Sequence, residues 1–237
     1  MANVNFPVQQ SQKVQTIYQG LQAAADEGNF YVATNATTGT AIATTTSVVD
    51  DAATASSTHA QASPVMVVVN GWSATDPNAK NIYLQYLRMK IVQVPTSATQ
   101  WNMSIRADNN AGAITSAGTA ITPVNVNTGS GNLSRATVQF GAITTALPNT
   151  SGRLLANAVI DPTIPVTLDQ WYITFGSLGM SMDQLSGGTN AKNITLCLAP
   201  IIIAPGWNIR IGMWGASNAA APSWEFELGY VERASGL

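Results

Sequence analysis

Apolar and polar residues alternate along much of this chain, and the clearest alternation lies near the C-terminus. Between residues 207 and 213, large apolar residues occupy every second position. They are Trp207, Ile209, Ile211 and Met213. A period of two residues is typical of a half-buried β-strand. Pro205-Gly206 precedes this run and suits the central positions of a type II turn. Residues 196–215 therefore predict a hairpin of strand, tight turn and strand.

The same period recurs at short intervals along the chain, between segments rich in glycine, proline and asparagine. The predicted strands lie within residues 63–72, 79–95, 97–112, 134–144, 152–179 and 223–233. In the second of these, Ile82, Leu84, Tyr86 and Arg88 are predicted to share one face. In the last, Trp224, Phe226 and Leu228 are predicted to oppose Glu225, Glu227 and Gly229. Strands of this spacing predict an all-β protein, an antiparallel β-sandwich of the jelly-roll type.

Only the N-terminal region has the period of a helix. Residues 11–28 carry an apolar stripe with the spacing i, i+3, i+4 and i+7. The stripe consists of Val14, Ile17, Tyr18 and Leu21. Ser11 suits the N-cap and Gly28 suits the C′ position. We expect residues 1–30 to form a helical arm and residues 31–237 to form one sandwich domain. The arm lies either on its own domain or on a neighbouring subunit.

The composition narrows the classes of partner. Charged residues make up 9% of the 237 residues, against roughly a quarter in average proteins, and the net charge is -2. Such a surface suits a protein that is assembled or secreted, and the absence of a basic patch makes nucleic acid an unfavoured partner.

The opening residues show no signal peptide, and no apolar run is long enough to span a membrane. We therefore expect synthesis in a cytoplasm without a standard export signal. Cys197, the single cysteine, is expected to be a small buried residue.

Nothing in the sequence predicts a metal, cofactor or catalytic site. His59 is the only histidine and stands among small residues in a loop, and one histidine with one cysteine excludes the common zinc sites. Asp50-Asp51 lacks further oxygen ligands at calcium-loop spacing, and residues 108–112 predict a turn. A glycosidase needs two carboxylates across a cleft, and no pair stands out, so a non-enzymatic protein is expected. The available carboxylates are Asp26, Glu27, Asp76, Asp161, Asp169, Asp183, Glu225, Glu227 and Glu232.

Tryptophans are the remaining candidates for ligand binding. Trp101, Trp207 and Trp224 are in phase with core-facing aliphatic residues, so they are expected in the core. Trp72 and Trp214 stand near strand ends, where exposure would let them form a platform for a ligand such as a sugar.

The closing segment, APIIIAPGWNIRIGMWGASNAAAPSWEFELGYVER, resembles the last strands of jelly-roll proteins on tailed-phage virions. The low charge and the abundance of Ala, Thr and Asn are similar to capsid decoration (cement) proteins and head-fibre modules. The resemblance implies a homo-oligomer, a trimer by expectation, that is assembled in the host cytoplasm. It would bind the major capsid protein on the capsid exterior and stabilise the lattice. The residues expected at the contact are Phe6, Val14, Ile17, Tyr18 and Leu21.

Two other functions stay open. The first is a carbohydrate- or receptor-binding module of a phage fibre or tail, in which Trp72 or Trp214 would be exposed. The second is a β-sandwich hydrolase, which would carry a carboxylate pair in a cleft.

Overall fold

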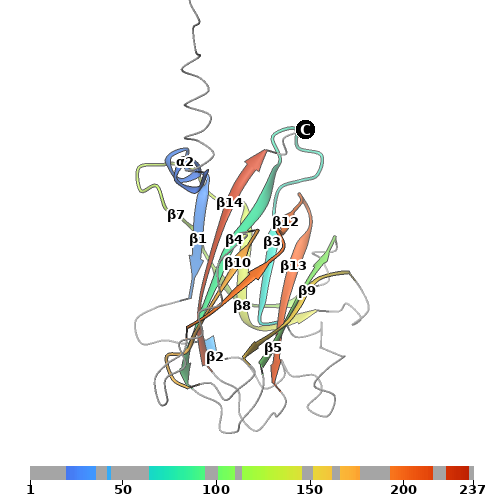
Figure 1. Ribbon diagram of the computed structural model, residues 1–237. Helices are drawn as coiled ribbons and strands as arrows, with labels where there is room; N and C mark the ends of the chain where they lie inside the picture. The colour runs from blue at the N-terminus through green and yellow to red at the C-terminus, as the bar shows by residue number, and fades with distance from the viewer. Residues whose placement is uncertain are drawn as a thin grey trace, which may run out of the picture.

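The computed structural model consists of two β-sheets packed face to face (Figure 1). The predicted all-β sandwich is therefore confirmed. The structure describes residues 20–35, 42–43, 64–93, 101–109, 114–145, 152–161, 166–176, 193–215 and 223–234. His59, Asp50-Asp51 and the arm residues Phe6, Val14, Ile17 and Tyr18 lie outside these ranges.

We name the larger sheet, of eight strands, sheet I, and the six-stranded sheet, sheet II. Sheet I has the order β11 (Asn193–Leu198), β10 (Gln170–Phe175), β4 (Lys80–Gln93), β14 (Ser223–Ala234), β1 (Phe30–Thr34) and β7 (Val124–Asn125). The short strands β12 (Ile202–Ile203) and β2 (Ile42–Ala43) pair with β4 and β14. Sheet II has the order β6 (Ile114–Ile121), β8 (Ala136–Thr145), β3 (Met66–Asn70), β13 (Asn208–Gly215), β5 (Trp101–Asp108) and β9 (Arg153–Asp161).

Eight of these strands pair in nested order, from the two ends of the chain inwards. The pairs are β1 with β14, β3 with β13, β4 with β10, and β5 with β9, and each is antiparallel. Strands far apart in sequence therefore lie side by side, and the first and last of the eight are neighbours in sheet I. Strands β6 and β8 extend sheet II beyond β3, and β11 extends sheet I as a strand parallel to β10.

Alternate residues from both sheets fill the core, as the period of two predicted. Trp224, Phe226 and Leu228 on β14 are buried. The rings of Trp171 and Trp224 lie 4.9 Å apart and link β10 to β14. Trp207 packs against the edge of this core, and the side chain of Trp101 lies outside the described part of the chain.

The predicted side to which the side chains of β4 point is wrong beyond Leu84. Ile82 and Leu84 point into the core, but Tyr86 and Arg88 point outwards. Gly229 pairs with Tyr86, but the next residue of β14 pairs with Leu84. The residue of β4 between Leu84 and Tyr86 therefore has no partner on β14, and the strand forms a bulge there. An extra residue reverses the phase of all residues that follow it.

The turn at residues 204–207 is confirmed, but the predicted hairpin is wrong. The amide of Trp207 donates to the carbonyl of Ala204 at 3.0 Å, and Gly206 has a φ of 76°. However, β12 pairs with β4 in sheet I, whereas β13 lies in sheet II. The turn therefore carries the chain from one sheet to the other.

Helix α2 (Gly20–Asp26) ends as the sequence predicts. Gly28 has a φ of 67°, its amide donates to Ala25, and the amide of Asn29 donates to Ala24. These two bonds form a Schellman motif, which needs the left-handed conformation that glycine adopts easily. Ala24 is buried, whereas Leu21, one turn earlier on the same stripe, is 50% exposed.

Cys197 differs from its prediction, because it is exposed. It lies on β11, an edge strand of sheet I, where Leu196 and Leu198 pack against the core. Cys197 is on the opposite, solvent-facing side of that strand.

Candidate functional site

The outer face of sheet I carries a small grid of polar and aromatic side chains. Neighbouring strands place these residues in register. Lys90 lies between Gln170 and Glu225, Arg88 lies between Tyr172 and Glu227, and Tyr86 lies between Thr174 and Gly229. Strands β10, β4 and β14 thus each contribute three residues to one surface.

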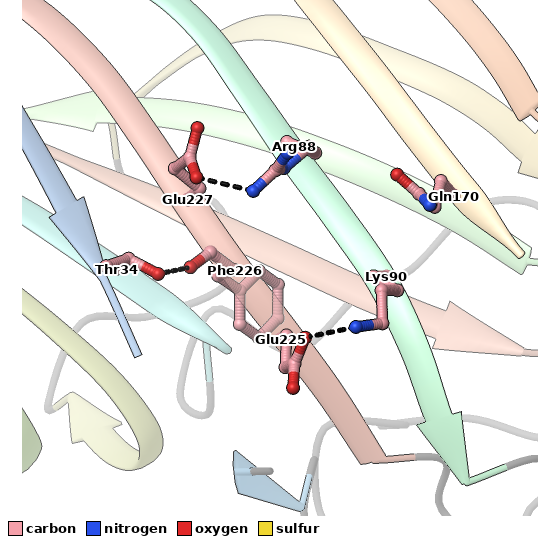
Figure 2. A pocket seen from close by; sticks show the side chains of 7 residues that line it. All are labelled: Thr34, Arg88, Lys90, Gln170, Glu225, Phe226 and Glu227. Carbon is pink, nitrogen blue, oxygen red and sulfur yellow. Dashed lines mark hydrogen bonds and ion pairs between the residues drawn. The ribbon is translucent and has the colours of Figure 1, made fainter. Parts of the chain in front are cut away.

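Two cross-strand ion pairs occupy the centre of the grid (Figure 2). Arg88 binds Glu227 at 2.5 Å, and Lys90 binds Glu225 at 2.7 Å. All four side chains are partly exposed, and exposed pairs of this kind stabilise a protein by only about 0.2–1 kcal/mol each. The two pairs make the charge of this surface balanced.

A polar pocket opens beside these ion pairs (Figure 2). Its volume is about 200 Å³. The lining residues are Thr34, Arg88, Lys90, Gln170, Glu225, Phe226 and Glu227.

The pocket forms where β1 stops pairing with β14. Thr34, the last residue of β1, donates from its hydroxyl to the carbonyl of Phe226 at 2.9 Å. The side chain of Asn35 then continues the contact, donating to the carbonyl of Trp224 and accepting from the amide of Phe226. A side chain takes the place of backbone at this point, next to Glu225 and Phe226, which line the pocket.

Two tyrosines stand next to the pocket. The rings of Tyr86 and Tyr172 are stacked with centroids 5.5 Å apart. The Tyr86 hydroxyl donates to Glu227 at 2.9 Å. Its ring lies against Gly229, where a Cβ atom would come within 2.2 Å of Cε1. Burial, and then the bond to Glu227, raise the pKa of Tyr86, and burial also raises the pKa of Tyr172, so both hydroxyls stay protonated at neutral pH.

Trp72 is partly exposed just after the end of β3. Its indole nitrogen donates to Glu232 at 3.2 Å, and the guanidinium of Arg135 lies 4.9 Å above its ring. Trp72 follows β3, whereas Trp214 lies about 20 Å away, near the other end of β13. The side chain of Trp214 lies outside the described residues. The structure therefore does not bring Trp72 and Trp214 together.

In the sequence, Glu225 and Glu227 are two members of a larger pool of carboxylates, and no pattern there marked their neighbours on β4 and β10 as part of a site. Their alternation with Trp224 and Phe226 placed them correctly on an outer face. The alternation of Tyr86, Arg88 and Lys90 on β4 was the signal available for the other half of the grid. The bulge concealed it, because it exchanged the inner and outer faces of that strand.

A second unusual surface is the edge of sheet II. Strand β9 pairs with β5 on one side and is the last strand of the sheet on the other. Three of its apolar side chains are exposed, namely Leu154 (49%), Leu155 (39%) and Val159 (45%). Edge strands normally carry charged residues or prolines, which prevent pairing with another chain.

Within the described ranges, no cluster of three or more His, Cys, Asp or Glu side chains is placed to hold a metal ion. The helix within those ranges is too short to cross a bilayer. Asp108, at the start of the predicted turn, ends β5 and contacts Arg210 of β13. No family model, curated protein or solved structure matches this chain.

Proposed function

We propose that this protein is a non-enzymatic structural protein of a phage virion, a capsid decoration (cement) protein that acts as a homo-oligomer. It would be made in the host cytoplasm, bind the major capsid protein on the capsid exterior and stabilise the lattice. The nested strand pairing supports a jelly roll, because that fold arises when a long hairpin rolls up and pairs its first strand with its eighth.

The observation that carries the assembly role is the exposed apolar edge of β9. Removing Leu154, Leu155 and Val159 from water would stabilise a contact with another subunit, at about 25 cal/mol for each Å² of apolar surface. The low charge of the chain acts in the same direction, since few charged groups lose their hydration when the surface is buried.

Strand β9 is also complementary to itself. The segment from Ala156 to Val159 is the regular part of β9, because its pairing with β5 is irregular at Leu155 and at Ile160. If two copies pair in antiparallel fashion about Asn157, Ala156 of each lies opposite Ala158 of the other. This arrangement has two-fold symmetry, as isologous contacts do. A trimer, which the sequence resemblance implies, is compatible with it where neighbouring trimers meet across a two-fold axis of a capsid lattice.

The N-terminal arm supports a second contact. The apolar stripe is buried at Ala24 and half-exposed at Leu21, so the domain does not fully cover the stripe within α2. We assign the stripe residues Val14, Ile17, Tyr18 and Leu21, together with Phe6, to a contact with a neighbouring subunit or the capsid protein.

Light scattering on a sizing column tests the assembly role. We expect the wild-type chain to form an oligomer. Val159→Lys should weaken it, because each copy would then bring a charge into the apolar contact at this edge. Val126→Lys is the matched control, since Val126 is also exposed (39%) but lies outside β9, and it should leave the oligomer unchanged. A wild-type chain that stays monomeric at high concentration, alone and with capsids, would contradict the proposal.

A carbohydrate- or receptor-binding module is the second candidate function. The polar pocket and the stacked tyrosines on sheet I favour it, whereas the apolar edge of β9 favours assembly. The two functions use different surfaces and are compatible in one protein.

A further inference from the structure

We propose that the outer face of sheet I binds a neutral, hydroxyl-rich ligand, a saccharide unit. The sugar lies on the ring of Tyr86 and places its hydroxyls in the pocket formed by Arg88, Lys90, Gln170 and Glu225. This site goes beyond the assembly role, because it lies in sheet I, whereas β9 lies in sheet II.

The ring of Tyr86 is held in a way that suits a stacking surface. The ring packs against the backbone of Gly229, and a Cβ atom on any other residue at that position would collide with it. Its hydroxyl is fixed by Glu227, and Tyr172 stacks beside it. A ring fixed at several points loses little conformational entropy when a ligand binds. The C–H face of a sugar ring is apolar and matches an aromatic surface of this kind.

The pocket supplies both hydrogen-bond donors and acceptors. Arg88 and Lys90 each have several N–H donors, of which the bonds to Glu227 and Glu225 use one apiece. Gln170 adds an amide. A sugar hydroxyl donates and accepts at once, so it can bridge neighbouring groups of opposite charge.

Charge and size select the ligand class. The two cationic side chains lie on β4 and the two anionic ones lie beside them on β14. A phosphate or carboxylate would therefore face Glu225 and Glu227, and a cation would face Arg88 and Lys90. The volume of about 200 Å³ is below the roughly 300–1,000 Å³ of pockets that enclose drug-sized ligands. A pocket of this size suits the hydroxyls of a single sugar unit that lies on Tyr86.

The test uses the full-length protein on an array of neutral hexose and N-acetylhexosamine oligosaccharides, with sialylated and sulfated glycans beside them. Calorimetry then gives the affinity for the best neutral glycan. We expect Tyr86→Ala to weaken binding at least about tenfold, which corresponds to about 1.4 kcal/mol. Gly229→Ala should weaken it similarly, because the new Cβ displaces the ring while every polar group remains. Tyr83→Ala is the matched control, since Tyr83 lies on the same strand and face outside the pocket, and it should change binding less than about twofold.

Thermal melts and light scattering on each variant show whether it is folded and whether its oligomeric state is unchanged. Loss of glycan binding in a folded Tyr86→Ala variant of unchanged oligomeric state supports the site without bearing on the assembly role. The site is wrong if no neutral glycan binds, if only acidic glycans bind, or if folded Tyr86→Ala binds as well as wild type. Should Gly229→Ala not fold, Tyr86→Ala and Gln170→Ala decide the question.

Discussion

The indole nitrogen of Trp72 donates a hydrogen bond to the carboxylate of Glu232, 3.2 Å away and 160 positions later in the chain. Glu232 is only 1% exposed and lies at the end of β14. It also accepts bonds from the Ser134 hydroxyl at 2.5 Å and from the amide of Arg135 at 3.0 Å. One carboxylate therefore joins the segment after β3, the segment before β8 and the last strand.

Glu232→Ala should destabilise the domain by about 2–3 kcal/mol, because it leaves buried donors without an acceptor. Glu232→Gln keeps one oxygen acceptor and should cost less than half as much. Urea unfolding followed by tryptophan fluorescence measures both variants. Equal losses in the two would mean that the Glu232 carboxylate is not the shared acceptor on which this junction depends.

The buried pair of Arg210 and Asp108 is a second place where one substitution should have a large effect. Arg210 is 2% exposed, and its Nη2 lies 3.4 Å from Oδ2 of Asp108. Burial lowers the pKa of Arg210, and the charge of Asp108 opposes this shift. Asp108→Ala should destabilise the domain by about 3–5 kcal/mol, because a buried cation loses its counter-charge.

The double variant Asp108→Ala/Arg210→Met removes both charges and should recover most of that loss. Chemical denaturation of wild type, both single variants and the double variant forms a complete cycle. A double variant as unstable as the sum of its parts would show that the two side chains act independently.

The domain should lose stability in alkali. Burial, and then the charge of Glu232, raise the pKa of Tyr31 above its ordinary value of 10, and burial also raises the pKa of Tyr230. Above about pH 10 these tyrosines ionise in the unfolded chain but stay protonated in the folded one. The unfolded state then binds fewer protons, so the free energy of unfolding falls as the pH rises.

Thermal melts between about pH 8 and about pH 12 should therefore show a Tm that is flat at first and declines above about pH 10. Tyr31→Phe should make the decline shallower, since one titrating group is removed. A Tm unchanged up to about pH 12 would contradict this account.

Gly206 offers a clean test of backbone strain. Its φ is 76°, and no atom lies within 4 Å of the place where a Cβ would stand. Gly206→Ala should cost about 1–2 kcal/mol, because alanine disfavours the left-handed region. Gly131 also has open space around it but no positive φ, so Gly131→Ala should be neutral or slightly stabilising. Equal Tm shifts for the two variants would contradict the assigned turn.

The sequence by itself determined the local structure, because the patterns involved depend only on neighbouring residues. Alternation on β14 required Trp224 and Phe226 to face inwards and Glu225 to face outwards. Pro205-Gly206 specified a tight turn through the φ values that these two residues favour, and Gly28 specified the end of a helix. Enough such strands within one chain determined an all-β sandwich.

The tertiary structure decided everything that depends on which strands pair. The turn at Gly206 joins different sheets because the partners of β12 and β13 lie far away in sequence. The bulge in β4 follows from its pairing with β14, and it places Tyr86 on the outer face above Gly229. Cys197 is exposed because it lies on the side of β11 opposite Leu196 and Leu198, which pack against the core. Hydrogen bonds between distant strands form only when the whole chain has folded, so no local pattern of apolar and polar residues records them.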